Sequence, residues 1–389
     1  MTAEVVFIIS CAVIAYTYAG YPALAYVLSR IFGRPARRAD ITPKVSVIIA
    51  ARNEERDIAA KIENALALDY PKEKLEIIVA SDSSTDRTDE IVRSYESRGV
   101  LLHRQTVRLG KTAAQNQAVR VSSGEILVFS DATTKWHADS VQRIVRSFAD
   151  PEVGCVAGQL LYADPTASAV GRGCSAYWSW EKQIRQSESR LGSLIGVSGC
   201  LYAVRRSCHR RLAGDMIDDF VIASEIHLQG LRTVYEPEAL AIEHTNRRAV
   251  EEFRMRVRVI EQTMSAFHRY RWLLSLRQRM FAFQLISHKV LRYTIPLFLM
   301  TAYASNFLVA TKDRLYAVTF SGMTLFYLAA LAGWVLSRLW RPIGLLTIPY
   351  YFALANLASV VAFVKFLRGD SRVVWEPVRD AIGPNLERS

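Results

Sequence analysis

The chain is poor in cysteine, and the few that it has are not arranged to bind a metal or to form a disulfide framework. None stands in a Cys-x-x-Cys pair, and none has a histidine at the spacing of a zinc site. This argues against a zinc-binding domain and a disulfide-stabilised secreted domain, so we expect free thiols in a reducing compartment. The cysteines are Cys11, Cys155, Cys174, Cys200 and Cys208.

The N-terminus lacks the features of a secretory signal. No basic residue precedes the first apolar run, which follows the acidic Glu4 instead, and the run has no short core with a small-residue cleavage site. A cleaved leader has a basic start and such a site. We therefore interpret this segment as a retained membrane anchor.

Although 22% of the residues in the whole chain are charged, four stretches contain no charged residue. Hydrophobic residues make up 51% of the chain. Each stretch is near or above the ~20 residues that cross a hydrocarbon core. The sequence therefore predicts a multi-pass protein of a bacterial inner (cell) membrane. The stretches are Val5–Ser29, Tyr293–Thr311, Leu315–Ser337 and Ile343–Val364.

The net charge of +12 does not indicate nucleic-acid binding, because the basic residues crowd beside the apolar stretches. Five follow the first stretch, and between Arg247 and Arg292 there are eleven Arg or Lys and only three Glu. Basic residues beside a span mark its cytoplasmic side and attract anionic lipids. We expect membrane lipids as partners, no nucleic acid, and a cytoplasmic domain after the first apolar stretch. The five residues are Arg30, Arg34, Arg37, Arg38 and Lys44.

The side of the C-terminal tail is not decided by these rules. Three full spans after a cytoplasmic domain would place the tail outside, yet it is basic at Lys365, Arg368, Arg372 and Arg379. Basic tails favour the cytoplasmic side. Either one C-terminal segment is re-entrant or the tail is external.

From Lys44 to about His244 the pattern is that of an α/β domain. Short β-rich runs alternate with helical patterns, which implies right-handed crossovers and a mostly parallel, Rossmann-like sheet with helices on both faces. The expected strands are Val45–Ile49, Leu75–Ala80, Val100–His103, Glu125–Ser130, Val153–Gln159, Leu201–Val204, Arg232–Tyr235 and Leu240–Glu243. The expected helices are Ile58–Leu68, Thr88–Arg98, Lys111–Val121, Ala138–Phe148, Ala169–Glu188 and Asp218–Gln229.

The rest of the chain divides around this domain. Glu251–Arg292 is a basic amphipathic stretch, which we predict to be an uninterrupted helix lying flat at the membrane interface. The predicted organisation is a transmembrane helix (1–30), a basic linker (31–43), the α/β domain (44–245), interfacial helices (246–292), C-terminal transmembrane helices (293–367) and a basic tail (368–389).

Carboxylates stand where two of the buried runs end. Asp82 follows Ile-Ile-Val-Ala-Ser and Asp131 follows Ile-Leu-Val-Phe-Ser, and a third acidic pair comes at Asp218-Asp219. The carboxyl edge of a parallel sheet is where open α/β folds hold their ligands. Acids gathered there can bind a nucleotide, hold a divalent metal and remove a proton, so the chain is expected to be an enzyme.

The ordered motifs resemble the family-two glycosyltransferases with a GT-A fold. They are Val45–Glu54, Ser81–Thr88, Gly110-Lys111 with Asn116, Ser130-Asp131, and Asp218-Asp219. The arrangement is most similar to the membrane-integral branch that includes the cellulose, hyaluronan and poly-N-acetylglucosamine synthases. The resemblance covers Lys44 to about Arg292, and the later spans by arrangement only.

The resemblance implies a nucleotide-sugar site after the first strand, formed by Ala51, Arg52, Asn53 and Glu54. A polar turn after a strand can offer backbone and side-chain groups to a base and ribose. The alternative is a simple helix entry with Asn53 as its N-cap.

The resemblance also implies that Asp82 contacts uracil, and that Lys111 contacts the diphosphate from the start of a helix. An acceptor-only carboxylate suits the N3–H of uracil. For Asp86 we favour a capping role at the helix that Thr88 begins. A solvated surface position is the alternative for Lys111.

The family carries an Asp-x-Asp motif that holds Mg²⁺ or Mn²⁺ on the donor, and here it reads Asp131-Ala132-Thr133. Mg²⁺ commonly takes one or two protein carboxylates plus phosphate oxygens and water, so Asp131 with the Thr133 hydroxyl remains a possible metal site. His244 is a further candidate ligand, and a structural histidine is the alternative.

The acidic pair stands where the family has its general base, which by position is Asp219. Inverting transfer needs a carboxylate to take the proton of the acceptor hydroxyl. Asp218 is expected to share this role or to cap the following helix.

The acceptor side is expected to include two further sets of residues. Gly199 and Cys200 lie in a glycine-containing loop that resembles the family's acceptor loop, where glycine lets the backbone approach a sugar. Arg254 and Arg258 share a helical face suited to a diphosphate. The Gln-x-x-Arg-Trp motif of processive synthases is missing, which weakens the case for polymer synthesis.

The predicted function is therefore inverting transfer of a sugar from a UDP-sugar to a lipid-linked or growing polysaccharide acceptor, as in exopolysaccharide biosynthesis. One alternative is a transferase of a single sugar to polyprenyl phosphate or a membrane glycolipid. Another is a non-catalytic, nucleotide-sensing subunit of a polysaccharide secretion complex. The residues alone leave the sugar, the acceptor and the oligomeric state open.

Overall fold

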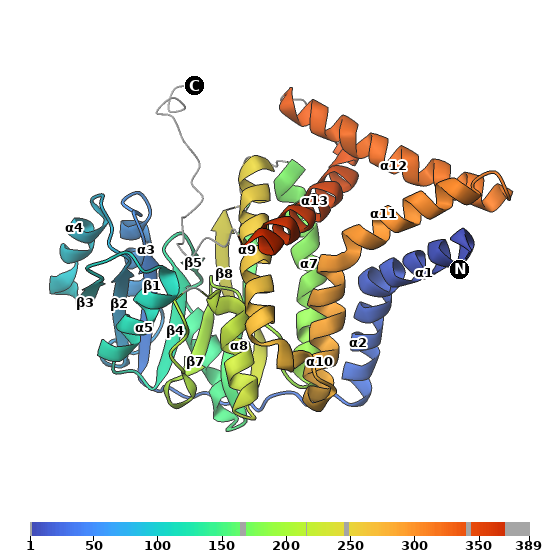
Figure 1. Cartoon of the computed structure of the whole chain (residues 1–389). Coiled ribbons are helices and arrows are strands. Elements are labelled where there is room, and N and C mark those ends of the chain that lie inside the picture. The colour runs from blue at the N-terminus through green and yellow to red at the C-terminus, as the bar shows by residue number, and fades with distance from the viewer. Residues whose placement is uncertain (1, 164–168, 215, 245–248, 340–343, 370–389) are drawn as a thin grey trace.

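The computed structural model describes residues 2–163, 169–214, 216–244, 249–339 and 344–369 (Figure 1). Its centre is one eight-stranded sheet in the order β3-β2-β1-β4-β7-β6-β8-β5. The strands are β1 (Val45–Ala51), β2 (Leu75–Ser81), β3 (Val100–Arg104), β4 (Ile126–Asp131), β5 (Lys135–Trp136), β6 (Val153–Ala163), β7 (Tyr202–Arg205) and β8 (Arg232–His244).

The first half of the sheet is parallel, as predicted. Strands β3, β2, β1 and β4 all run in one direction, and Ala50 of β1 is in register with both Ala80 of β2 and Asp131 of β4. Strands β1 and β4 are buried almost throughout and β2 over its last five residues, which explains their nearly continuous apolar sequences. The edge strand β3 is partly exposed. The carboxyl ends of the parallel strands therefore meet at one edge of the sheet.

The second half is mixed. Strand β7 runs antiparallel to both of its neighbours, β4 and β6, while β6 and β8 are parallel to each other. The two predicted strands Arg232–Tyr235 and Leu240–Glu243 are one strand, β8, with a register shift against β6 between Gly158 and Gln159. The two-residue strand β5 was not predicted, because it is too short to show a pattern.

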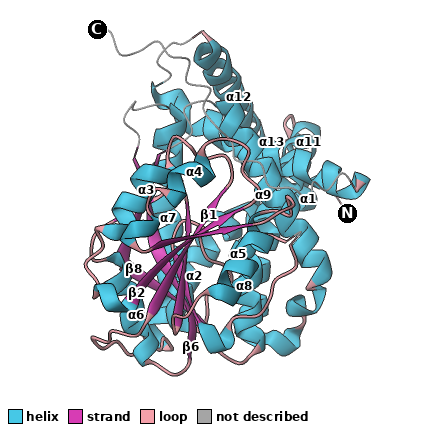
Figure 2. Ribbon diagram, turned by 90° about the vertical axis from the view of Figure 1, so that its left-hand side faces the viewer, coloured by secondary structure: helices cyan, strands magenta, loops and turns pink. Residues whose placement is uncertain are grey.

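Helices cover both faces of the sheet (Figure 2). On one face α3 (Ile58–Leu66) and α6 (Ser140–Val145) pack against the strands through Ile58, Ile62 and Ile144. On the other face α5 (Lys111–Val121) and α8 (Asp218–Leu228) contribute Ala118 and Phe220. The core is thus two apolar layers separated by the sheet.

The remaining elements differ in length from the sequence prediction. Helix α4 (Thr88–Arg93) is shorter than predicted and is followed by a separate 3-10 turn at Glu96–Arg98. A 3-10 turn at Arg146–Ala149 likewise replaces the last turn predicted for α6. Helix α7 (Ala169–Leu191) is slightly longer than predicted. Four described cysteines carry free thiols, as expected: Cys11, Cys155, Cys200 and Cys208.

The prediction of one uninterrupted helix over Glu251–Arg292 was wrong. Helix α9 (Ala249–Arg269) ends before two 3-10 turns, Arg271–Leu274 and Leu276–Gln278. They are followed by α10 (Arg279–Gln284) and a π-helical segment, η8 (Leu285–Val290). The break buries Leu273 and Phe281 in the core beside α8, and this tertiary contact outweighs the local helical pattern.

Three described stretches are long and apolar enough to cross a membrane: Ala3–Ile31, Arg314–Arg338 and Gly344–Arg368. The first contains α1 (Ala3–Ala15), a π-helical turn at Tyr16–Gly20 and α2 (Tyr21–Ile31). The other two contain α12 (Arg314–Arg338) and α13 (Thr347–Arg368). The predicted span at Tyr293–Thr311 corresponds to α11 (Leu291–Val309), which is not one of the three. Most of the predicted basic tail lies outside the described residues.

Helices α1 and α11 lie side by side (Figure 1). A hydrogen bond joins the hydroxyls of Ser10 and Thr301 at 3.0 Å, and Lys312, just after α11, forms a 3.2 Å ion pair with Glu4 at the start of α1. The end of α11 therefore lies at the level of the beginning of α1.

Candidate active site

Lys111 is the first residue of α5, and its ammonium reaches carboxylates from two other elements. Its Nζ lies 2.8 Å from Asp131 Oδ1 at the end of β4 and 3.3 Å from Asp218 Oδ2 at the start of α8. Burial alone would lower the pKa of Lys111, but Asp131, Asp218 and Asp219 together raise it well above its usual value. Lys111 is thus a permanent cation at a helix N-terminus, a position that also favours anions.

Gly199 lies in the middle of this cluster. A Cβ atom at this position would be 2.6 Å from Lys111 Nζ, 3.1 Å from Asp219 Oδ1 and 3.2 Å from Asp131 Oδ2. Contacts below 3.0 Å require something to move, so only glycine leaves these three groups where they are. Gly199, predicted to lie in the acceptor loop, is therefore next to both the predicted base, Asp219, and the predicted diphosphate-binding residue, Lys111.

The two adjacent aspartates are pushed toward different protonation states. Burial, then the neighbouring Asp218 and Asp131, raise the pKa of Asp219 to about 7, although Lys111 opposes this. Burial would also raise the pKa of Asp218, but Lys111 and hydrogen bonds from Asp219 and Gln115 lower it below the usual value. Two carboxyls separated in this way are typical of an acid–base pair. Asp219 can act as a general base near neutral pH.

Asp218 does not cap α8, so that alternative was wrong. The helix begins at Asp218 itself, the N-cap position is Ile217, and no side chain caps the helix there. The carboxylate of Asp218 instead accepts a hydrogen bond from the Tyr202 hydroxyl at 3.2 Å and pairs with Lys111. Asp218 therefore faces the cluster.

The structure adds one carboxylate that was missed in the sequence, Glu243 near the end of β8. Its Oε2 accepts a hydrogen bond from the Cys200 thiol at 2.9 Å, and its Oε1 accepts one from the Thr133 hydroxyl at 3.4 Å. Burial and the charge of Asp131 raise the pKa of Glu243. The signal in the sequence was an acidic residue at the end of a predicted strand, but the residue predicted as a ligand there was the adjacent His244.

The residues present fit a divalent metal that is held partly by the donor. In the described part of the chain, no group of three or more His, Cys, Asp or Glu side chains could hold a metal by itself. Asp131, Glu243 and Thr133 nevertheless offer the hard oxygen ligands that Mg²⁺ and Mn²⁺ prefer. Burial, and after it the charge of Asp131, raise the pKa of Glu243, and a cation bound there would stabilise its ionised form. His244 ends β8, but its side chain lies outside the described residues.

Asp82 has a different environment from the one expected. It is buried, and its carboxylate accepts hydrogen bonds from Gln105 Nε2 at 2.9 Å and from the main-chain N–H groups of Leu109 at 2.9 Å and Gly110 at 3.0 Å. A carboxylate has about four acceptor positions, so three are used by the protein. Asp82 thus holds the loop that presents Lys111, and a contact with uracil stays a prediction.

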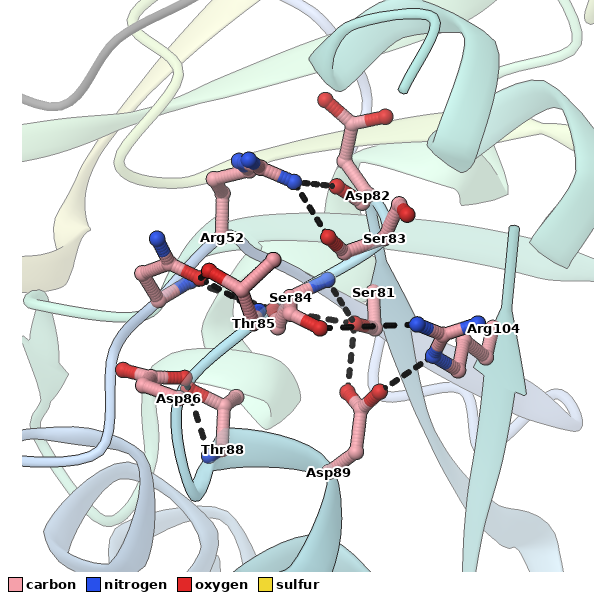
Figure 3. Close-up of polar contacts among 11 residues, drawn as sticks. Arg52, Ser81, Asp82, Ser83, Ser84, Thr85, Asp86, Thr88, Asp89 and Arg104 are labelled. Carbon is pink, nitrogen blue, oxygen red and sulfur yellow. Dashed lines mark hydrogen bonds and ion pairs between the residues drawn. The ribbon is translucent and has the colours of Figure 1, made fainter. Parts of the chain in front are cut away.

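The loop after β1 is tied to the loop after β2, as Figure 3 shows. Arg52 donates from one guanidinium nitrogen to the main-chain oxygens of Asp82 and Ser83, and Ala51 O accepts the N–H of Asp82 at 3.0 Å. Asn53 has a left-handed φ of 52° and accepts the N–H of Thr85 at 2.7 Å. Hydrogen bonds from both main chain and side chains therefore hold the two loops together.

Asn53 is not a helix cap. Helix α3 begins at Ile58, several residues later, and Asp57 occupies its N-cap position. Glu54, buried beside this turn, donates its N–H to the Thr88 hydroxyl at 2.7 Å. Nucleotide contacts by Ala51, Arg52, Asn53 and Glu54 stay predictions, on a turn that the β2 loop holds rigidly.

Asp86 bonds the first residue of α4 as expected, but the N-cap position itself is Arg87. Asp86 Oδ1 accepts the N–H of Thr88 at 3.0 Å and the Thr88 hydroxyl at 2.6 Å, at the first residue of α4. The adjacent Asp89 accepts bonds from Ser81 and Arg104, as Figure 3 also shows. Asp86 and Asp89 therefore stabilise the loop after β2 and are not part of the carboxylate cluster.

The other acceptor-side candidates lie on different elements. Cys200 is buried next to Gly199, and its thiol and main-chain oxygen bond Glu243 and Trp136. Arg254, on α9, is exposed, and among the described residues no ion pair joins it or Arg258 to the cluster. Their diphosphate role stays a prediction.

The predicted acids thus meet only in part. Asp131, Asp218 and Asp219 converge with Lys111 on Gly199, while Asp82 lies one loop away and is joined to them through Gly110. The arrangement places a fixed cation, a carboxylate near neutral pKa and metal-type oxygen ligands around one point. These are the groups that a hydroxyl needs in order to displace a diphosphate.

Comparison with known proteins agrees with this chemistry. The family described as Glycosyl transferase family 2 matches residues 46–212, a range that contains Asp82, Lys111, Asp131 and Gly199. The match ends just before Asp218, so the acidic pair is placed by the structure and not by the family match.

Two relatives are each just under 30% identical to this chain over the aligned residues. Beta-monoglucosyldiacylglycerol synthase of Nostoc sp. is 29% identical over 215 residues, covering 52% of this chain and 46% of that protein. Poly-beta-1,6-N-acetyl-D-glucosamine synthase of Staphylococcus aureus is 28% identical over 214 residues, covering 53% and 51%. The chain spans about half the length of these relatives.

The structure is similar to that of the mannosyltransferase PcManGT from Pyrobaculum calidifontis, solved in complex with GDP-Man and Mn²⁺. The TM-score is 0.70 and the identity 26%, over 93% of this chain and 99% of that one. The likeness extends over the helices that follow the sheet as well as the catalytic domain. Residues 46–212 therefore carry a Glycosyl transferase family 2 domain, and the fold of the chain is similar to that of a solved mannosyltransferase.

Proposed function

We propose that the protein transfers a sugar, with inversion, from a UDP-sugar to a lipid-linked or growing polysaccharide acceptor at the membrane face. The observation that carries this proposal is the convergence of Lys111, Asp131 and Asp219 on Gly199. A donor diphosphate placed at Lys111 and the N-terminus of α5 would lie beside the carboxylate that titrates near neutral pH.

In the proposed reaction Asp219 accepts the proton of the acceptor hydroxyl as its oxygen bonds to the anomeric carbon. The bond between that carbon and the diphosphate breaks on the opposite side, and the nucleoside diphosphate leaves with its charge stabilised by Lys111. Asp218 stays ionised and holds Lys111 in place. A divalent ion bound by Asp131, Thr133 and Glu243 would neutralise further negative charge on the diphosphate.

The choice of UDP rests on Asp82 alone, and three of its acceptor positions are used by the protein. The similar mannosyltransferase was solved with GDP-Man. The decisive experiment therefore incubates the purified chain with Mn²⁺, membrane lipids and a panel of UDP-glucose, UDP-galactose, UDP-N-acetylglucosamine and GDP-mannose. Release of UDP is expected, and it should be lost in Asp219→Asn although that variant still binds UDP.

The membrane arrangement that we propose keeps the catalytic domain in the cytoplasm of a bacterial cell. Helices α1 and α11 would cross together, because Glu4 and Lys312 form an ion pair at their far ends. Helix α12, almost entirely exposed in the structure, would return. Helix α13 packs Ala358 and Ala362 against Val257 of α9, so it would lie at the cytoplasmic interface. This order returns the basic tail to the cytoplasm.

A single transfer to a membrane lipid is a second candidate, and one observation favours it over polymer synthesis. The segment that carries the acceptor motif in processive synthases is broken after Arg269, and residues 268–272 have histidine where Gln-x-x-Arg-Trp has glutamine. Sizing the product separates the two, because a single transfer yields one discrete glycolipid and a processive enzyme yields a ladder.

A further inference from the structure

Lys289 points its ammonium into the catalytic domain, although it stands where the chain enters the apolar helix α11. It belongs to η8, and π-helical turns are frequent at functional sites. Its Nζ lies 5.1 Å from the centre of the buried Phe220 ring, the residue after Asp219. A lysine at a membrane boundary usually extends toward the headgroups, and this one does not.

The loop that carries Gly199 also joins Lys289 to the base. A Cβ atom at Gly196 would be 3.3 Å from Lys289 Nζ and 3.4 Å from the main-chain oxygen of Asp219. The N–H of Val197 donates to that same oxygen at 2.8 Å. In this loop, Gly196 therefore lies beside the ammonium of Lys289, and Gly199 lies beside the carboxylate of Asp219.

Charged groups of both signs lie near Lys289, with Arg185 and Arg292 opposed by Asp219 and Glu181. Glu181 pairs with Arg292 at 3.0 Å, with His288 at 3.1 Å and with Arg185 at 3.3 Å. In the part of the chain that the structure describes, no carboxylate lies within ion-pair distance of Lys289, which is itself half-buried. Burial and then Arg185 lower its pKa to about 8. A half-buried cation in such surroundings is stabilised by an anionic ligand.

A cavity of about 190 Å³ lies beside Arg185, and Lys289 is not one of its lining residues. Arg185 lines it and so connects it with Glu181, while Trp178, Tyr235 and Lys182 form much of the remaining wall. Aromatic and basic side chains together suit a ligand that has an apolar part and an anionic part.

We propose that Lys289 binds a phosphate group of a membrane-embedded acceptor, and so holds the acceptor hydroxyl near Asp219. This rests on the proposed function, since it names the chemical class of that acceptor as a lipid phosphate. The lipid source is favoured over a free phosphate because η8 continues directly into the apolar helix α11, which we propose to cross the membrane. The hydroxyl proton passes to Asp219 as before, and the phosphate takes no part in bond making.

The test measures binding and needs no sugar transfer. The full chain is reconstituted in phosphatidylcholine nanodiscs and titrated with farnesyl phosphate, farnesol or inorganic phosphate. Wild type should bind farnesyl phosphate at least about tenfold more tightly than farnesol, the effect of one charge-assisted hydrogen bond. Lys289→Met should lose this preference and Lys289→Arg should keep most of it. Lys312→Met removes the same charge from an exposed residue and should change nothing.

Three results would overturn the assignment. If wild type shows no preference for farnesyl phosphate over farnesol, the site does not select a lipid phosphate, and this arm does not depend on any variant folding. If inorganic phosphate binds as tightly as farnesyl phosphate, the ligand is a free anion. If Lys289→Met keeps the preference while still binding UDP, the cation is another residue. Loss of UDP release in the donor panel would leave these results intact, so the two proposals fail separately.

Discussion

The ammonium of Lys111 and the carboxylate of Asp131 form a 2.8 Å ion pair across the carboxyl end of the sheet. One is delivered by the first residue of α5 and the other by the last residue of β4. A donor diphosphate and Asp131 would share this cation, so the pair marks the position of the leaving group.

Replacing Lys111 by methionine should lower kcat by roughly 100-fold, because one fixed charge at the leaving diphosphate is lost. Lys135→Met is the matched control, since Lys135 is exposed on the neighbouring β5. Initial rates of nucleotide release measure both. Equal activity of the two variants would refute the role of Lys111.

Gly199→Ala should reduce kcat by at least about tenfold while leaving the melting temperature nearly unchanged. The added methyl group would displace Lys111, whose Nζ would be only 2.6 Å away, and a small misplacement of a catalytic group costs much of its effect. Gly192→Ala in the same loop meets nothing within 4 Å and should behave as wild type. A fully active Gly199→Ala enzyme would show that this point is not the reaction centre.

The rate should rise with pH and reach half its maximum near pH 7. The pKa of Asp219 is raised to about 7, so the carboxyl is protonated and inactive below that pH and is ionised, as a base must be, above it. Lys111 opposes the rise, so Lys111→Met should move the acid limb to higher pH. A pH–rate profile of kcat in both proteins tests this; a flat profile between pH 5 and 8 in wild type contradicts it.

Glu243→Gln should weaken Mn²⁺-dependent UDP binding by about tenfold, since it removes one oxygen charge from the expected metal site. Asp131→Ala should weaken it as well, although part of its effect passes through Lys111. Glu73→Gln, at an exposed turn, is the control. Calorimetry with and without Mn²⁺ gives the affinities, and unchanged metal dependence in Glu243→Gln would exclude Glu243 as a ligand.

A green fluorescent protein fused to the C-terminus should fluoresce in a bacterial host, because α13 is proposed to lie at the cytoplasmic interface. Alkaline phosphatase fused after Lys312, in a chain truncated there, should be active, because α11 is proposed to end outside. The opposite pair of signals would show that α13 crosses the membrane and that the tail is external.

Much of the donor half of the domain could be predicted from the sequence. The bounds of α5 agree residue for residue with the pattern Lys111–Val121, and β1, β2 and β4 begin within one residue of the predicted positions. These elements are set by local features: buried β-branched runs, a glycine before the helix, and polar turns after the strands. The placement of Asp131 at a strand end followed directly.

The other half depended on contacts between distant segments. Glu243 lies in the site because the two predicted strands form one strand, β8, which pairs with β6. No local sequence pattern predicts this pairing. The basic stretch after Ala249 read as one helix, but burial of Leu273 and Phe281 broke it.

The sequence by itself determined which chemistry this chain carries: strand-end carboxylates, a lysine at a helix start and glycine where a side chain would intrude. Only the tertiary structure decided which of these groups meet. The reversed strand β7 brings the Gly199 loop and α8 back onto the end of β4, so Asp219 reaches Asp131 and Lys111, while Asp82 turns to hold the loop beside them. Local sequence specifies a residue's place along its own strand or helix, but the order of strands in a sheet depends on packing between segments far apart in the chain.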